Sequence, residues 1–280
     1  MKKEYKKISK AKKKQNKKRY GISKYRSSVP RTIQIATKRQ KSGTFKFSLN
    51  QTWINDPSSY VATGNKIEFL HFRANSILNC HMPTQVSVNS QWTSQDPTKY
   101  NNQIPSAVSQ SVDGLALYQH LYQHFVVTGS KISVQYQAVG SGVPSTLFIV
   151  KHGVTNVVNQ NTTAAKLNEL PYTKRSAITT TALATGGQSA NCRLSHTYSA
   201  KSFEGIKDPT SSSVLRGNFP APGLTPPYAG LTPSEQTYYS VALAPIDPIA
   251  TGDMPQGIFR IKVEYVCKVM EPTINNDLIR

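Results

Sequence analysis

The feature that most constrains the fold of this 280-residue chain is the uneven placement of its charge. The chain carries 34 Lys or Arg residues and 14 Asp or Glu residues, a formal net charge of +20. Residues 1–41 contain 17 of the basic residues and one acid, Glu4, which is +16. This segment has no apolar period of 3.6 or 2 residues and so no face to bury against a core. We therefore expect a disordered arm, residues 1–41, and a folded domain, residues 42–280.

The arm has the chemistry of a nucleic-acid-binding segment. Each Lys or Arg that meets a phosphate releases condensed cations, so binding is strong, salt-sensitive and independent of sequence. Tyrosines among the basic residues are candidates for stacking on unpaired bases, which favours single-stranded nucleic acid. The predicted binding residues are Lys12, Lys13, Lys14, Lys17, Lys18, Arg19, Tyr20, Lys24, Tyr25, Arg26, Arg31, Lys38 and Arg39. The predicted nuclear-localisation signal is the central cluster of Lys12, Lys13, Lys14, Lys17, Lys18 and Arg19.

A basic tail can also have roles other than nucleic-acid binding. A solubility tail or a patch for anionic membrane has a similar charge. Membrane binding is disfavoured because the arm has few bulky aliphatic residues besides Ile8 and Ile22 and has no amphipathic stripe. The chain contains no apolar run of membrane-spanning length and no apolar core of a secretory signal, so we expect no membrane insertion and no secretion.

Alternation of apolar and polar residues dominates residues 42–280. The clearest case places Phe259, Ile261, Val263, Tyr265, Cys267 and Val269 on one face and Arg260, Lys262, Glu264 and Lys268 on the other. Further strands are predicted within 44–53, 66–73, 131–138, 145–151, 192–198, 201–205 and 238–244. The strands do not alternate with helices in βαβ units. This series therefore predicts an all-β fold, a single eight-stranded jelly-roll β-sandwich with long loops.

Helices and loops are predicted between these strands. Leu117, Leu121 and Phe125 recur every four residues, which predicts a short helix over 115–125 with one buried face. One or two helical turns are expected over 163–170. The polar stretch 75–112 and the proline-rich stretch 219–233 are predicted surface loops, and loops of such length usually serve an interface or an exposed surface.

No catalytic or metal-binding pattern stands out, so we expect no enzyme activity, no metal and no cofactor. His120 and His124 have a zinc-compatible spacing, but Leu121 occupies the position where a zincin motif requires Glu. The acids of the domain form no closely spaced pair, and no G-x-S-x-G motif is present. The three cysteines form no CxxC pair and are expected to be buried small hydrophobes: Cys80, Cys192 and Cys267.

The layout of the chain resembles a known family. The similar stretches are the basic arm and residues 122–134, 198–207 and 258–266. Together they resemble the capsid proteins of small viruses, above all those of circular, Rep-encoding single-stranded DNA viruses, the circovirus-like group. The resemblance implies an icosahedral shell of about 60 identical subunits (T=1) with the arms directed onto a single-stranded DNA genome. It also implies a virion protein that meets the nuclear import machinery in the host nucleus and an unknown receptor at the host cell.

Three alternatives remain at this stage. The coat protein of a small RNA or satellite virus would share the arm and the fold, because counterion release does not distinguish DNA from RNA. A cellular basic nucleic-acid-binding β protein should carry a basic, aromatic-lined groove on the β domain itself. A secreted lectin-like sandwich is disfavoured by the arm and by the missing signal.

Overall fold

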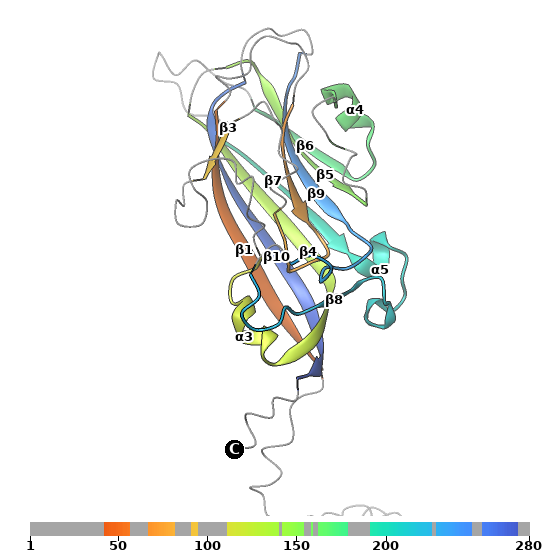
Figure 1. Ribbon diagram of the computed structural model, residues 1–280. Coiled ribbons are helices and arrows are strands. Elements are labelled where there is room, and N and C mark those ends of the chain that lie inside the picture. Colours follow the sequence, from red (N-terminus) through yellow and green to blue (C-terminus); the bar gives the residue numbers. More distant parts are fainter. Residues whose placement is uncertain are drawn as a thin grey trace, which may run out of the picture. The chain divides into compact units, whose positions relative to one another are not determined.

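Two antiparallel β-sheets form the domain in the computed structural model (Figure 1). The structure describes residues 42–56, 67–81, 91–94, 111–139, 142–153, 158, 162–178, 191–225, 228–247 and 254–273. The chain divides into two units, 1–41 and 42–280, and every described residue belongs to the second.

One sheet has six strands in the order β3-β1-β10-β4-β7, with β8 paired to β4. Its strands are β1 (Ser42–Asp56), β3 (Gln91–Ser94), β4 (Tyr122–Ala138), β7 (Asn191–Ser199), β8 (Arg216–Asn218) and β10 (Gly257–Pro272). The other sheet has the order β2-β9-β5-β6. Its strands are β2 (Glu68–Arg73), β5 (Ser145–His152), β6 (Thr173–Ile178) and β9 (Tyr238–Pro245).

The strand pairing is nested, which defines the fold as a jelly roll. Leaving aside the short strands β3 and β8, the first strand pairs with the last, β1 with β10, and the second with the second-last, β2 with β9. In the same way β4 pairs with β7, and β5 with β6. This is the pattern of a long antiparallel ribbon rolled into two sheets of four main strands each. The predicted jelly-roll sandwich is therefore confirmed.

The core lies between the two sheets and is supplied by the alternating residues of the long strands. Phe259, Val263 and Tyr265 of β10 are fully buried, as are Ile132 and Val134 of β4. Partners from the opposite sheet in the same core cluster include Leu70, Leu147 and Val241. The prediction of which face of β10 and β4 points inward is confirmed.

The predicted helix over 115–125 is wrong beyond its first turn. Helix α3 spans only Leu115–Gln119, and strand β4 begins at Tyr122. Leu117 is 72% exposed and Leu121 is 41% exposed, so the supposed buried face does not exist. Phe125 is instead buried on β4, opposite Val269 of β10. From Tyr122 onward, pairing with β10 outweighs the local helical spacing, because it satisfies the backbone groups of that part of the chain.

Two other predictions along the chain need correction. The short strand expected over 201–205 is wrong, since helix α5 occupies Ala200–Phe203. The eighth strand of the jelly roll is β6, which the sequence pattern did not reveal because β6 lies at an edge and alternates weakly. Helix α4, Ala164–Glu169, confirms the helical turns predicted over 163–170, with the Thr163 side chain accepting a hydrogen bond from the backbone NH of Lys166.

The start of the predicted surface loop 75–112 is buried. Residues 74–81 are all buried, and Ile77, Leu78 and Cys80 belong to the core cluster. Polar side chains here bond to backbone: Asn75 Nδ2 donates to the Glu235 carbonyl at 2.6 Å, and Asn79 Nδ2 donates to the Tyr228 carbonyl at 3.3 Å. These bonds let a polar segment enter the core. Residues 82–90 and 95–110 of the predicted loop lie outside the described residues.

Candidate nucleic-acid interface

The predicted nucleic-acid-binding residues of the arm, from Lys12 to Arg39, all lie outside the described residues. Their roles in binding and in nuclear import therefore stay predictions. The arm is joined covalently to Ser42, the first residue of β1. Ser42 lies opposite Met270 of β10, so β1 begins at the end of the six-stranded sheet where β10 finishes.

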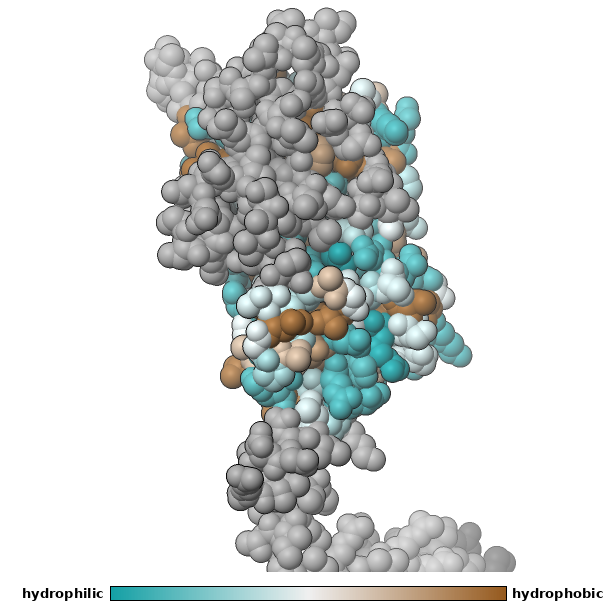
Figure 2. All heavy atoms as spheres, viewed as in Figure 1, coloured by the Kyte–Doolittle hydropathy of each residue, from teal (hydrophilic) through white to brown (hydrophobic). Residues whose placement is uncertain are grey.

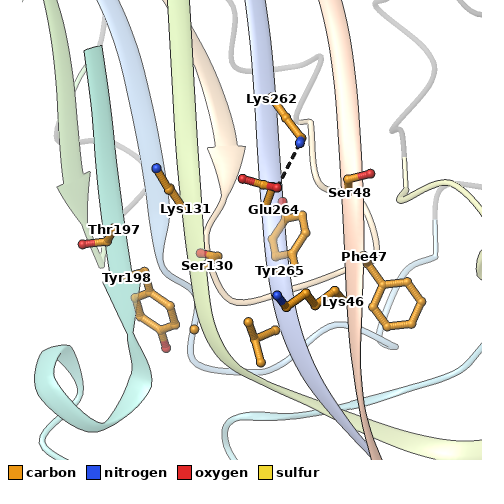
Figure 3. Close-up of a pocket in the computed structure, with 12 residues that line it drawn as sticks. Lys46, Phe47, Ser48, Ser130, Lys131, Thr197, Tyr198, Lys262, Glu264 and Tyr265 are labelled. Carbon is orange, nitrogen blue, oxygen red and sulfur yellow. Dashed lines mark ion pairs between the residues drawn. The ribbon is translucent and has the colours of Figure 1, made fainter.

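The described domain carries a basic site of its own on the outer face of the six-stranded sheet (Figure 3). Lys46 of β1, Lys131 of β4 and Lys262 of β10 are exposed there, together with Glu264 of β10. They are neighbours because of the strand register, in which Glu264 lies directly opposite Lys131. The alternation of each strand turns these side chains outward while Tyr265 points into the core.

A depression of about 510 Å³ lies among these residues and crosses the strands β1, β10, β4 and β7. Outward hydroxyl groups of Ser48 and Thr197 line it beside the lysines. Ammonium and hydroxyl groups are hydrogen-bond donors suited to phosphate oxygens. The chemistry of the depression is therefore that of an anion-binding surface.

The charges in this site do not balance. Glu264 Oε1 lies 2.9 Å from Lys262 Nζ. The hydrogen bond from Lys262 lowers the pKa of the Glu264 carboxyl, and the charges of Lys262, Lys131 and Lys46 lower it further. Glu264 is therefore ionised at neutral pH, and one carboxylate faces three ammonium groups, which leaves an excess of positive charge at the surface of the sheet.

The two histidines with zinc-compatible spacing do not lie on one helix. His120 is the C-cap residue of α3, whereas His124 belongs to β4. His124 Nδ1 lies 2.6 Å from Asn218 Oδ1, and its Nε2 lies 3.2 Å from Glu271 Oε2. Across the described ranges, no three His, Cys, Asp or Glu side chains are grouped so as to hold a metal ion. No described helix has the length and apolarity to span a membrane.

A pair of buried histidines is a feature that the sequence analysis missed. His71 Nδ1 and His152 Nε2 each lie 2.6 Å from Ser240 Oγ. Burial, helped by the charge of His152, lowers the pKa of His71 to about 3. Burial alone lowers the pKa of His81, which lies against Trp53, to about 3. The position of His71 within an apolar run was the available signal, but its partner is 81 residues away in the sequence.

Exposed apolar residues are dispersed on the side of the molecule seen in Figure 2, where the described hydrophobic residues form small groups between hydrophilic ones. Leu117 and Leu121, on and beside α3, are exposed apolar residues. Single exposed apolar residues are normal on protein surfaces.

No protein-family model and no curated protein sequence matches the chain. Several solved structures have a similar chain path. One is a semi-empty particle of the nodavirus of the giant freshwater prawn Macrobrachium rosenbergii. Its TM-score is 0.41 at 8% identity, and the match covers 85% of this chain and 99% of that chain. A tobacco necrosis virus structure has a TM-score of 0.38, 10% identity and coverage of 82% and 97%. A decameric BFDV capsid protein has a TM-score of 0.35, 10% identity and coverage of 81% and 98%. The jelly-roll fold of this chain is defined by its nested strand pairing.

Proposed function

We propose that the chain is a viral capsid protein that assembles into a small icosahedral shell and packages its genome through the N-terminal arm. The observation that carries the proposal is the unequal distribution of charge between the arm and the folded domain. Residues 1–41 hold +16 of the formal charge, while residues 42–280, with 17 basic and 13 acidic residues, hold +4 and form a jelly roll. A nearly neutral shell-forming domain with a polycationic tail is suited to enclosing a polyanion.

The shell is proposed to contain about 60 copies with T=1 symmetry. About 60 arms of +16 each supply roughly 1,000 positive charges, the order needed to offset much of a genome of one to a few thousand nucleotides. We propose single-stranded DNA as that genome and a circovirus-like virus as the source. The protein is then structural rather than enzymatic, and its partners are its own copies, the genome, the host nuclear import machinery and an unidentified receptor. It resides in the virion and in the host nucleus during assembly.

The coat protein of a small RNA or satellite virus is the second candidate. The arm favours it equally, because counterion release acts on RNA and DNA phosphates alike. Nucleic acid extracted from native particles and then treated with DNase or RNase distinguishes the two candidates.

Electron microscopy of the purified full-length protein tests the proposal. We expect uniform closed shells that contain nuclease-protected nucleic acid. Monomers that bind nucleic acid but form no shells across a range of pH and salt would contradict it and favour the cellular nucleic-acid-binding protein.

A further inference from the structure

Basic residues gather on one face of the jelly roll beyond the depression itself. Outward positions of β1, β10, β4 and β7 form four rows across the sheet, from the row of Lys46, opposite Val266, to the row of Thr52, opposite Arg260. The cations in these rows are Lys46, Lys131, Arg193, Arg260 and Lys262, and the acid is Glu264. Apart from Val266 and Gly129, the other positions are Ser, Thr, Asn or Gln.

The net charge of these four rows equals that of the domain. Five basic residues and one acid give the rows +4, and residues 42–280 as a whole also have 17 − 13 = +4. The remainder of the domain is therefore formally neutral. A surplus concentrated on one flat face attracts a polyanion far more strongly than the same charge dispersed over the surface.

The composition of the face indicates what it contacts. The outward side chains of the four rows include no aromatic residue, so bases have no ring on which to stack. Hydroxyl, amide and ammonium groups instead suit phosphate and sugar oxygens. Rows repeat at about 6.7 Å along a strand and strands lie about 4.8 Å apart, so several donors meet one chain of phosphates.

We propose that the outer face of strands β1, β10, β4 and β7 is a second phosphate-binding surface, which contacts the sugar-phosphate backbone of single-stranded nucleic acid without reading its sequence. The inference rests on the proposed capsid function. It adds that this face of the jelly roll is turned toward the genome in the assembled particle. Arg193 and Arg260, which flank Gln135 in one row, extend the surface beyond the depression.

Salt-dependent binding of a thymidine oligonucleotide to the full-length chain tests the proposal. The test variant is K46Q/K131Q/K262Q. The matched control is K166Q/K201Q/K207Q, which removes the same charge from exposed lysines outside the six-stranded sheet. With roughly 0.7 released counterions for each phosphate contact, the slope of log K against log salt should fall by about 2 in the test variant. Its affinity should fall at least about tenfold at about 0.15 M salt, while the control changes little.

A variant with the opposite expected sign separates binding from misfolding. Glu264→Gln removes the acid from the face and releases Lys262 from its ion pair, so affinity for the oligonucleotide should increase severalfold. Thermal melting of each variant checks that the exposed substitutions leave the fold intact.

The outcomes distinguish this inference from the proposed function. An unchanged salt slope in the folded triple variant, or weaker binding by E264Q, would overturn the second surface and leave arm-based packaging intact. A triple variant that binds normally but forms no particles would also overturn it, because the face would then contact another copy. If the wild-type protein forms no shells, the capsid function fails, whereas a reduced slope in the triple variant still supports the phosphate-binding surface.

Discussion

His71 and His152 lie on β2 and β5, the two strands that flank β9, with ring centroids 6.0 Å apart and ring planes at 80°. Both rings meet the hydroxyl group of Ser240 on that strand. Two imidazoles that share one hydroxyl group are compatible with a neutral cluster and not with two imidazolium ions, since like charges at this distance repel inside a poorly solvated site.

The domain should therefore lose stability in acid. The pKa of His71 and that of His81 are about 3 in the folded state against 6.5 as the ordinary value, so the unfolded state takes up protons first. The contribution of these two histidines to the free energy of unfolding is fully present above about pH 6.5 and is lost as the pH falls toward 3. By about pH 5 the loss is roughly 2 kcal/mol for each histidine. Urea unfolding near neutral pH and near pH 5 measures this. Replacement of the exposed His120 by Gln should leave the difference unchanged, and equal stabilities at the two pH values would refute the account.

A buried hydrogen bond between the sheets gives a second prediction. The Tyr265 hydroxyl on β10 donates to the Arg73 carbonyl on β2 at 2.8 Å, and Tyr265 is fully buried. Tyr265→Phe should lower the free energy of unfolding by about 1–2 kcal/mol, because the carbonyl loses its partner. Tyr265→Ala should cost about 3–5 kcal/mol, because it also leaves a cavity. Chemical denaturation measures both, and a Phe variant as stable as the wild type would show that the bond is not needed.

The first residue of β10 gives a third prediction. A Cβ atom at Gly257 would lie 2.4 Å from the ring of Tyr136, whose hydroxyl donates to the Pro255 carbonyl. Gly257→Ala should destabilise the domain by about 1–3 kcal/mol, because the fully buried ring has to move. Gly153→Ala is the matched control, since the nearest atom to its Cβ is 4.0 Å away. Equal melting temperatures for the two variants would be inconsistent with the packing described here.

Removal of the arm gives a fourth prediction. The nested pairing and the core belong entirely to residues 42–280, so a chain starting at Ser42 should keep its two sheets. It should bind single-stranded nucleic acid far more weakly at about 0.15 M salt, because 17 of the 34 basic residues are gone. Circular dichroism and fluorescence anisotropy measure the two effects. Full affinity in the truncated protein would disprove the role assigned to the arm.

The sequence predicted those parts of the fold in which local pattern and tertiary pairing agree. The alternation from Phe259 to Val269 allows one buried face only, and β10 has that face. The pattern failed from Tyr122 onward, where the helical spacing is overruled by the ladder to β10, and the side chains of Leu117 and Leu121 are exposed. Burial of residues 74–81 was not predictable, because it depends on backbone partners more than 100 residues away, such as Glu235.

For the basic face, too, local sequence pattern predicted only part of the arrangement. The outward positions of Arg260 and Lys262 were evident from the alternation of β10. Their assembly with Lys131 and Arg193 depends on the register of β4 against β10 and β7, which no local pattern specifies. The arm residues, whose roles follow from composition alone, lie outside the described residues and stay predictions.

The mass of the purified particle, after external nuclease treatment, is the decisive test of assembly into a closed shell. At 30.9 kDa for each chain, a shell of about 60 copies contains about 1.9 MDa of protein, and the packaged nucleic acid adds to that mass. We predict one narrow population at or above this mass by native mass measurement. A protein that stays monomeric, or that forms a continuous series of small oligomers under all assembly conditions, would contradict the capsid account.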